Sequence, residues 1–427
     1  VSLMPQCGTV PAEGAETACD VRVRNEERGM RMDKTSEDSR AYRYSVTLQD
    51  SAGHRVDAAL SALSRAALLS FRFPEEVTPR LVIQGLHLPA ANKNFMNDID
   101  ERRSLLKGWI RVNPEAGEII GYNPDRQSHM WGPELEGFRG WFVIRFDRPI
   151  LSWGCWADDT LYAGREGLKP KVRNGAWVDF APGTGTVRVQ IGTSFIGEAE
   201  ARAAIAEELP GWDLKKLERQ VRRLWAGKLR KLQVRGVDED QQTIFYTAVF
   251  HAYQLPRELG EDGRYYSAYD AEIHEGASFT DFATWDTFRA LHPLMTLLEP
   301  ELTVSWIKAL LDIYEQGGWL PKWPNPSYTN VMIGTHADAI ISDAYMKGIR
   351  DYEAMPEEYS SQLRDMFAQY LHQEQTLRGG LVAARALRDT LIDSTLAQVF
   401  LEVEFGDSTR EQVSLPLVLT EKEWRMK

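Results

Sequence analysis

Cysteine is scarce in this sequence, and its placement excludes a disulfide framework. Cys7, Cys19 and Cys155 are the three cysteines among 427 residues, and an odd, irregularly spaced set is not typical of a disulfide-stabilised fold. Cys7 and Cys19 could close a 12-residue loop in an oxidising compartment, and free or buried thiols are the alternative. The chain has no Cys-x-x-Cys and no His-x-x-x-His pair, so its motifs give no support for a zinc site.

Excess positive charge and long apolar runs are also missing. Asp and Glu number 62 against 50 Lys and Arg, for a net charge of −12, which argues against a nucleic-acid partner because phosphate binding needs a basic face. No apolar run approaches the roughly 18 residues of a membrane span. The Gly-x-Ser-x-Gly, Gly-x-Gly-x-x-Gly and Walker patterns are lacking as well. The chain begins at Val1 without a signal peptide, so the sequence leaves localisation open.

Aromatic residues, in contrast, are abundant. The chain has 13 Trp, 15 Tyr and 16 Phe, together 10% of its residues. Flat aromatic faces pack against pyranose rings in sugar-binding clefts, so this enrichment favours a carbohydrate ligand. The alternative is that a large β-rich protein buries these rings in its core.

Residues 1–208 carry the pattern of β-strands. Short alternating segments are separated by Pro and Gly turns, without helical periodicity between them. This pattern predicts an antiparallel β-sandwich rather than a βαβ fold. The charged segment 22–40 is expected to be an exposed loop. The alternating segments are 42–48, 69–73, 80–83, 140–146 and 187–193.

From residue 198 the apolar period becomes helical. A short helix is expected over 201–209, and 209–236 is interpreted as a helical linker. Residues 237–355 are expected to form the first part of a helical barrel or bundle with long, function-sized loops. Its helices are predicted at 238–253, 286–298 with an interruption at His292-Pro293, 301–316 and 336–348. Residues 356–427 form a divergent tail, predicted helical over 357–393 and as strands over 398–405 and 414–419.

The densest polar and aromatic residues lie in loops between 251 and 336, which also hold four of the eight histidines. If Asp286 opens a helix, Arg289 lies one turn on, on the same face. The two could form a local salt bridge. They could instead hold vicinal sugar hydroxyls while Trp285 stacks on the ring.

A second candidate group follows at 322–338. Lys322 lies between Pro321 and Trp323. These neighbours restrict the lysine, which therefore differs from a freely solvated surface lysine. His336 and Asp338 are two residues apart at a predicted helix start, so they point to different faces and are not expected to hydrogen-bond to each other. Asp338 could also be an ordinary first-turn acid.

Several sequence blocks, taken in order, resemble glycoside hydrolase family 92. The resemblance covers the region from about Val1 to Met355, and the blocks are Ile244-Phe245-Tyr246-Thr247-Ala248, Thr284-Trp285-Asp286-Thr287-Phe288-Arg289, Leu291-His292-Pro293-Leu294, Gly318-Trp319-Leu320-Pro321-Lys322-Trp323, Met332-Ile333-Gly334-Thr335-His336-Ala337-Asp338, Asp343-Ala344-Tyr345 and Lys347-Gly348. The resemblance implies an N-terminal antiparallel β-sandwich, N-terminally incomplete here, followed by a partial (α/α)6 barrel. It also implies an inverting, calcium-dependent exo-α-mannosidase acting on mannose-containing glycans of the N-glycan type, commonly exported.

By the same resemblance, seven residues are expected in the substrate cleft. They are Trp285, Asp286 and Arg289 as the floor of the mannose subsite, with Lys322, Trp323, His336 and Asp338 further along. The family's calcium ion contacts two mannose hydroxyls and wants oxygen ligands. An inverting mechanism also needs a Glu acid and an Asp base about 6.5–9.5 Å apart.

The sequence departs from the family pattern after Met355. Neither the Glu-bearing acid motif nor the Asp-bearing base motif is found between 356 and 427, so the catalytic residues stay unassigned. The chain could therefore be inactive alone. Two alternatives remain: a non-catalytic glycan-binding protein using the same cleft, and another (α/α)6 glycosidase in which Glu272, Glu275 or Asp281 does the chemistry.

Overall fold

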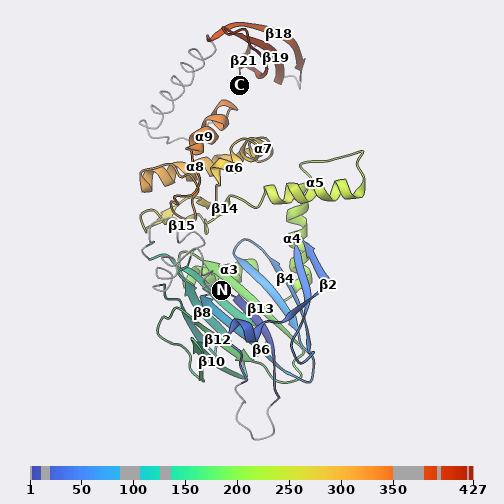
Figure 1. The fold of residues 1–427 in the computed structure, drawn as a ribbon, viewed down its shortest axis with the longest axis vertical. Coiled ribbons are helices and arrows are strands. Elements are labelled where there is room, and N and C mark those ends of the chain that lie inside the picture. The colour runs from blue at the N-terminus through green and yellow to red at the C-terminus, as the bar shows by residue number, and fades with distance from the viewer. Residues whose placement is uncertain are drawn as a thin grey trace. The chain divides into compact units, whose positions relative to one another are not determined.

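The computed structural model describes residues 2–10, 20–86, 106–125, 135, 137–349, 379–391, 396–420 and 423–426. The chain divides into two compact units (Figure 1). The first unit comprises Val1–Phe282 and Trp323–Val331, and the second comprises Ala283–Lys322 and Met332–Lys427. Each unit is described by itself.

The first unit contains the predicted β-sandwich, which is confirmed as two antiparallel sheets. The five-stranded sheet has the order β1 (Ser2–Gly8), β6 (Thr78–Leu86), β12 (Asn174–Asp179), β10 (Ser152–Ala157), β11 (Thr160–Ala163). The eight-stranded sheet has the order β2 (Arg31–Arg40), β3 (Arg43–Gln49), β4 (Arg55–Ala62), β5 (Ala66–Arg72), β13 (Thr186–Ser194), β9 (Gly140–Phe146), β8 (Glu118–Asn123), β7 (Trp109–Asn113).

The core of the sandwich is built from the alternate residues of both sheets. Leu81 and Ile83 of β6 pack with Val187 and Val189 of β13, and all four are fully buried. Strands present successive side chains to opposite faces, so alternation along each strand buries one apolar row between the sheets. Gly175 allows a close approach here: a Cβ atom on it would lie 2.1 Å from the carbonyl oxygen of Ile83.

The expected loop over 22–40 is wrong. The segment forms a short helix, α1 (Asn25–Arg28), and then β2, the edge strand of the eight-stranded sheet. Its charged side chains are mostly exposed and pair across the edge, as in the Arg55–Asp33 ion pair of 2.9 Å. Charged residues are common on edge strands because they discourage pairing with other chains, and this composition resembles that of a loop.

Three helices follow the sandwich: α3 (Glu198–Glu208), α4 (Leu214–Leu229) and α5 (Glu239–Ala252). The helical prediction for 209–236 is confirmed over α4, whose Leu217 and Val221 pack on Ala66 and Leu68 of β5. Asp238 and Gln241 form a capping box at the start of α5. Two small hairpin-like sheets then pair β14 (Arg257–Glu258) with β17 (Phe279–Thr280) and β15 (Arg264–Tyr266) with β16 (Ile273–Glu275).

The second unit begins with four helices: α6 (Thr284–Thr287), α7 (Leu291–Leu298), α8 (Pro300–Gly317) and α9 (His336–Met346). The predicted interruption within 286–298 exists, but it lies at 288–290 rather than at Pro293. Pro293 falls in the first turn of α7, where its missing N–H leaves no helical bond unmade. α8 ends at Gly318, whose left-handed φ of 83° terminates the helix.

The described part of the tail is a four-stranded antiparallel sheet in the order β18 (Leu381–Leu391), β19 (Leu396–Phe405), β20 (Arg410–Thr420), β21 (Glu423–Met426). The strands predicted at 398–405 and 414–419 are confirmed. The helix predicted over 357–393 is wrong at 381–391, where β18 pairs with β19 along its length, and its part at 357–378 lies outside the described residues.

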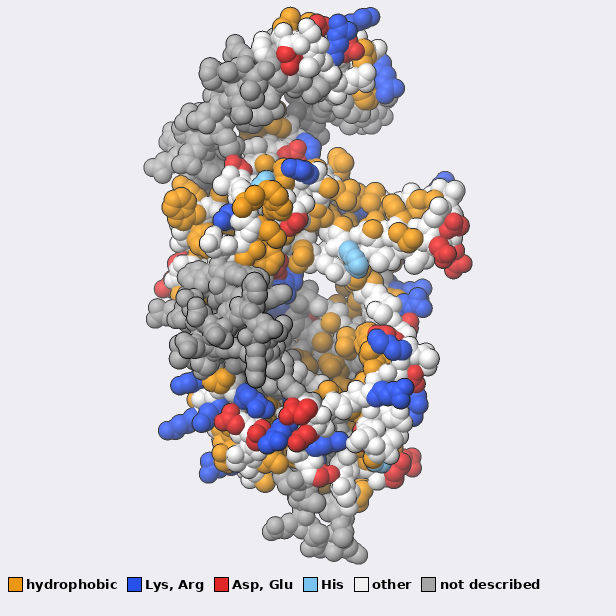
Figure 2. All heavy atoms as spheres, in the orientation of Figure 1, with side chains coloured by type: hydrophobic (Ala, Val, Ile, Leu, Met, Phe, Trp, Pro, Cys, Tyr) orange, Lys and Arg blue, Asp and Glu red, His pale blue; other side chains and the backbone are white. Residues whose placement is uncertain are grey.

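Surface exposure of apolar residues is uneven among the helices. Figure 2 shows apolar side chains on the surface of α5, α7 and α8, and Ile244, Leu297 and Trp319 are among the most exposed. Within the part of the chain that the structure describes, no helix is both long and apolar enough to cross a membrane.

Candidate functional site

Trp285 lies on α6 with its side chain partly open to solvent, at 40% exposure. The helix follows Ala283, which takes a left-handed φ of 41°. Thr284, next to Trp285, is buried and donates a hydrogen bond of 2.6 Å to the Lys322 carbonyl. This bond fixes α6 to the loop after α8, so the indole is presented from an anchored turn.

The His336 ring holds the indole from the side. The two rings meet edge to face at 5.2 Å and 85°, and His336 also packs on Phe288 at 4.4 Å. Nδ1 of His336 is buried without a hydrogen-bond partner among the described residues. Gly334 makes this arrangement possible, because its φ is 84° and a Cβ there would lie 2.1 Å from the His336 ring.

Asp286 and Arg289 do not form the local salt bridge considered above, so that interpretation is wrong for the described structure. α6 ends at Thr287, so Arg289 is not one helical turn from Asp286. The Arg289 guanidinium lies over the Phe288 ring, 4.9 Å from its centre. Both charged side chains are exposed, which leaves their hydrogen-bonding groups accessible to a ligand.

Lys322 and Asp338 have local partners in the second unit. Nζ of Lys322 lies 3.4 Å from the Met332 carbonyl oxygen and donates to it. Asp338 is a first-turn residue of α9 and accepts a 2.8 Å bond from the Ala339 N–H. No bond joins His336 to Asp338 within the described residues, as predicted. The simpler interpretation of Asp338 as a first-turn acid therefore fits its contacts.

The seven predicted cleft residues divide between the two units. Trp323 belongs to the first unit, where its carbonyl accepts a hydrogen bond from Thr329. The other residues belong to the second unit. The structure brings Trp285 and His336 into contact, with Arg289 joined to them through Phe288. We call Trp285, Asp286, Phe288, Arg289 and His336 the Trp285 cluster.

The other histidines of this region have different surroundings. His292 is buried in α7, edge to face with Trp306 at 5.2 Å, and burial lowers its pKa to about 4. His274 pairs with Asp270 at 2.8 Å on the first unit, and His251 is exposed on α5. His336 is thus the histidine of the four that packs on a predicted cleft residue.

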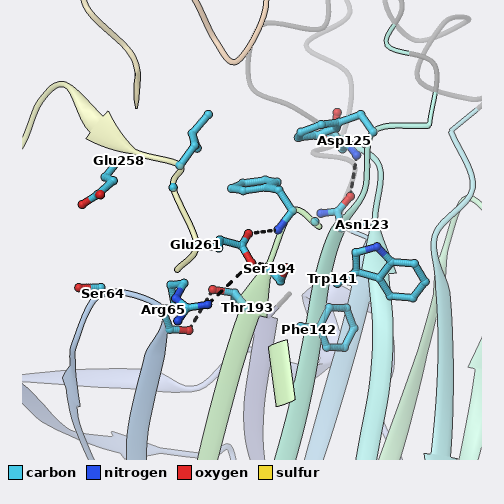
Figure 3. Close-up of a pocket in the computed structure, with 15 residues that line it drawn as sticks. Ser64, Arg65, Asn123, Asp125, Trp141, Phe142, Thr193, Ser194, Glu258 and Glu261 are labelled. Carbon is cyan, nitrogen blue, oxygen red and sulfur yellow. Dashed lines mark hydrogen bonds and ion pairs between the residues drawn. The ribbon is translucent and has the colours of Figure 1, made fainter. Parts of the chain in front are cut away.

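A cavity of about 330 Å³ in the first unit was not predicted from the sequence (Figure 3). Glu261 is buried in its wall and accepts bonds from Ser194 Oγ at 2.5 Å and from the Phe195 N–H at 2.6 Å. Burial raises the pKa of Glu261, although these donors and nearby Arg65 oppose the rise. The lining residues are Ser64, Arg65, Asn123, Asp125, Phe138, Gly140, Trp141, Phe142, Thr193, Ser194, Phe195, Glu258, Leu259, Gly260 and Glu261.

The two carboxylates of this cavity differ in their contacts. Figure 3 shows Glu261 directed at Ser194 and Arg65, with Glu258 apart from them. Burial also raises the pKa of Glu258, and Arg65 opposes this. Because Glu261 joins the 258–261 loop to the end of β13, its visible role is to hold the loop on the sandwich.

The described residues around the Trp285 cluster do not fit a calcium site. Calcium takes six to eight oxygen ligands, whereas Asp286 is isolated and Asp338 is bonded to its own helix. Among the described residues, the set of three potential side-chain ligands that converges is Cys7, Asp50 and His54, in the sandwich.

Sequence profiles of one family match nearly the whole chain. The Glycosyl hydrolase family 92 N-terminal domain matches residues 1–194, and the family's catalytic domain matches residues 200–415. The chain belongs to glycoside hydrolase family 92. Both the family and the sandwich-plus-helices fold predicted from the sequence are confirmed. The catalytic-domain match extends past Met355, where the resembling blocks end.

Individual relatives of this family 92 chain are distant. An uncharacterized secreted glycosidase of Arthroderma benhamiae is 26% identical over 256 residues, which cover 55% of this chain and 29% of that protein. A family GH92 inverting mannosidase from Bacteroides thetaiotaomicron has a similar structure, with a TM-score of 0.70 and 26% identity over 82% of this chain. A family GH92 alpha-mannosidase from the same organism has a TM-score of 0.67 and 22% identity.

The family 92 chain spans less than half the length of these solved structures, 43% and 45% respectively, and a smaller share of the curated relative. The second structure, at 22% identity, supports the fold alone. Activity, substrate and partners of the whole proteins therefore enter below as proposals.

Proposed function

We propose that this chain binds a terminal mannose of an α-mannoside at the Trp285 cluster, as part of a glycosidase of the α-mannosidase type. A half-exposed indole supplies an apolar face for a pyranose ring. Asp286 and Arg289 supply an acceptor and a planar set of donors for vicinal hydroxyls. A similar structure at 26% identity carries the name mannosidase, which supports mannose over other sugars.

The observation that carries this proposal is the missing Asp286–Arg289 ion pair. A structural pair on a surface helix would neutralise itself and offer little to a ligand. Here both groups are exposed beside an anchored Trp285, and no described residue neutralises either of them. Unused hydrogen-bonding groups next to an open aromatic face are what a polar, ring-shaped ligand requires.

The wider properties implied by family membership belong to the same proposal. They are inverting hydrolysis, dependence on calcium, N-glycan-type substrates and export from the cell, the last supported by the word "secreted" in the name of one relative. The general acid and base are unassigned, so the proposal for the described residues is recognition of the sugar.

The test compares mannose binding by the full chain with binding by Trp285→Ala. We expect weak, millimolar binding in a calorimetric or NMR titration, reduced about 10- to 100-fold by the substitution, because the stacking surface is lost. Trp141→Ala is the matched control, since Trp141 lines the separate cavity of the sandwich. Equal binding by wild type and Trp285→Ala would contradict the proposal, as would loss in Trp141→Ala alone.

Hydrolysis is tested separately on an aryl α-mannoside, with calcium and with a chelator. Turnover that disappears on chelation would extend the proposal to the calcium-dependent reaction. Turnover that is indifferent to calcium would contradict the calcium expectation. Binding without turnover would favour the glycan-binding alternative.

The contacts of Asp281 argue against the alternative in which other carboxylates do the chemistry. Asp281 is buried and bonded to both Arg257 and Asn325, so its carboxylate is already neutralised within the first unit. Glu272 and Glu275 are exposed on the β15–β16 hairpin region. Loss of turnover in Glu272→Gln or Glu275→Gln would restore this alternative.

A further inference from the structure

Three side chains of different chemistry meet in the sandwich of the first unit. Cys7 lies on β1 of the five-stranded sheet, whereas Asp50 and His54 flank the turn between β3 and β4 of the eight-stranded sheet. Their potential ligand atoms all lie within 4.8 Å of one another. The group therefore joins residues from both sheets at one point.

The turn that carries Asp50 and His54 is held in place by its own hydrogen bonds. Oδ1 of Asp50 accepts 2.9 Å bonds from the N–H groups of Ala52 and His54. The other oxygen, Oδ2, lies 3.0 Å from Nδ1 of His54. The Asp50 side chain is almost fully buried, so its position is fixed by the fold before any ligand arrives.

The Asp50 carboxylate acts on the Cys7 thiol through space. Burial and then the Asp50 carboxylate raise the pKa of the Cys7 thiol to about 12, with Arg22 opposing and Glu76 adding to the rise. Burial also tends to raise the pKa of Asp50, but hydrogen bonds from the His54 ring and backbone more than offset this and hold it below its usual value. A cation among these groups would be stabilised by Asp50 and would favour the thiolate.

Within the part of the chain that the structure describes, Cys7 is a free thiol with no other chemical partner. Cys19, with which the sequence allows a loop closure, lies outside the described residues. A half-buried thiol beside a carboxylate and an imidazole presents one sulfur, one oxygen and one nitrogen donor. Zinc accepts this mixture at about 2.0–2.3 Å in tetrahedral geometry.

We propose that Cys7, Asp50 and His54 bind Zn²⁺, with water in the fourth position, and that the ion ties the two sheets of the sandwich together. Tetrahedral ligands lie roughly 3.3–3.8 Å apart, and the potential ligand atoms here lie within 4.8 Å of one another. Side-chain movements of about 1–1.5 Å would therefore close the site. On binding, the Cys7 S–H bond breaks, the proton goes to solvent, and an Sγ–Zn bond forms. The sequence motifs do not reveal this site because its ligands are far apart in the chain.

The experiment uses the full chain, stripped with a chelator and kept reduced with a phosphine. Titration with Co²⁺ is expected to give the thiolate-to-cobalt charge-transfer absorption at a single equivalent, and Zn²⁺ is expected to displace it. Zn²⁺ should also raise the midpoint of thermal unfolding by several degrees, because an ion that binds the folded state stabilises it. A chelator should reverse that rise.

Two variants test the ligands, and a third is their control. Cys7→Ser is expected to abolish the charge-transfer band and the thermal shift. Asp50→Asn keeps an oxygen for the turn hydrogen bonds but removes the charge, and it should weaken metal binding about 10-fold or more. Cys155→Ser is the matched control, because Cys155 is a buried thiol of the same sandwich that donates to the Arg165 carbonyl, and it should keep the band.

The proposal is overturned if wild-type protein gives no thiolate band at saturating Co²⁺, or if the band persists in Cys7→Ser. Folding of Cys7→Ser is checked by its metal-free thermal midpoint. If that variant does not fold, His54→Gln provides the same test, since it removes a ligand from the exposed side of the site and leaves the thiol intact.

Discussion

The sandwich and the helices of the second unit differ in how far they expose their aromatic side chains. Trp156, Phe142 and Phe180 of the sandwich are almost fully buried, whereas Trp285 and Trp319 of the second unit are 40% and 75% exposed. The aromatic enrichment of the sequence therefore has two sources, a packed core and an accessible surface. Burial of aromatic rings in a β-rich core, one of the two interpretations offered from composition, fits the sandwich, whereas a carbohydrate ligand at the exposed rings stays a proposal.

The charged residues of the two units also differ, because Arg80 and Glu118 of the sandwich are paired and those of the Trp285 cluster are exposed. In the sandwich, buried Arg80 is paired with Asp179 and Asp20. Burial would raise the pKa of Glu118, but bonds from Arg202 and Arg145 more than offset it and keep the pKa low. The Trp285 cluster instead leaves exposed charges beside an open ring. Pairing within the fold supports stability, and unpaired groups at a surface are available for recognition.

The largest expected effect is on the stability of the sandwich. Phe180→Ala should lower the free energy of unfolding by about 3–5 kcal/mol, because this fully buried ring packs edge to face on Phe146 at 5.4 Å. Denaturant titration measures the change, and Leu297→Ala, at a side chain 77% exposed, is the control with a change of less than about 0.5 kcal/mol. Equal effects would refute the assignment of the core. Mannose binding by folded Phe180→Ala should stay unchanged.

The second prediction concerns pH and the buried His292. Because its folded pKa is about 4 against 6.5 unfolded, the unfolded chain takes up a proton first as the pH falls. Its contribution is fully present above pH 6.5 and is lost progressively down to about pH 4, for a total of about 3 kcal/mol. Unfolding free energies of wild type and His292→Gln at pH 7 and pH 4 measure this. The variant should lose less stability between the two values, and identical losses would be evidence against a buried neutral histidine.

The strands and helices that the sequence predicts well are those with one buried face. β13 alternates because one side meets the core, and α8 carries an apolar stripe because one side is covered. β2 fails this rule because an edge strand exposes most of its side chains. β18 fails because its Ala-, Leu- and Arg-rich sequence favours a helix locally, whereas pairing with β19 overrides that preference.

The candidate sites also differ in how well the sequence predicts them. Trp285 and His336 were identifiable because each lies in a compact sequence block, and the structure brings these two blocks together. The cavity around Glu261 and the Cys7 group draw their residues from distant segments, each ordinary by itself. The packing of one sheet on the other, and of the 258–261 loop on the end of β13, places those segments side by side, and local sequence patterns do not determine that packing.

A smaller effect is expected at Arg289, whose guanidinium carbon lies over the Phe288 ring, 4.9 Å from its centre. Arg289→Lys should weaken mannose binding about 3- to 10-fold, because an ammonium group keeps the charge but loses the planar set of donors. Its measurement is the mannose titration described for Trp285→Ala, with Lys308→Ala on the exposed side of α8 as control. Unchanged binding in Arg289→Lys would mean that charge alone, or no contact at all, operates at this position.

The smallest effect separates the two roles open to Asp338. As a first-turn acid that accepts from the Ala339 N–H, it should stabilise α9 by about 0.3–1 kcal/mol. Asp338→Asn removes the charge but keeps an acceptor, so its unfolding free energy should fall by no more than that amount while mannose binding stays the same. If binding falls more than about 3-fold, which corresponds to roughly 0.7 kcal/mol, Asp338 contacts the sugar and belongs with Asp286 and Arg289. The result would then extend the recognition surface along α9, from His336 to Asp338, beyond the residues that the ring contacts connect.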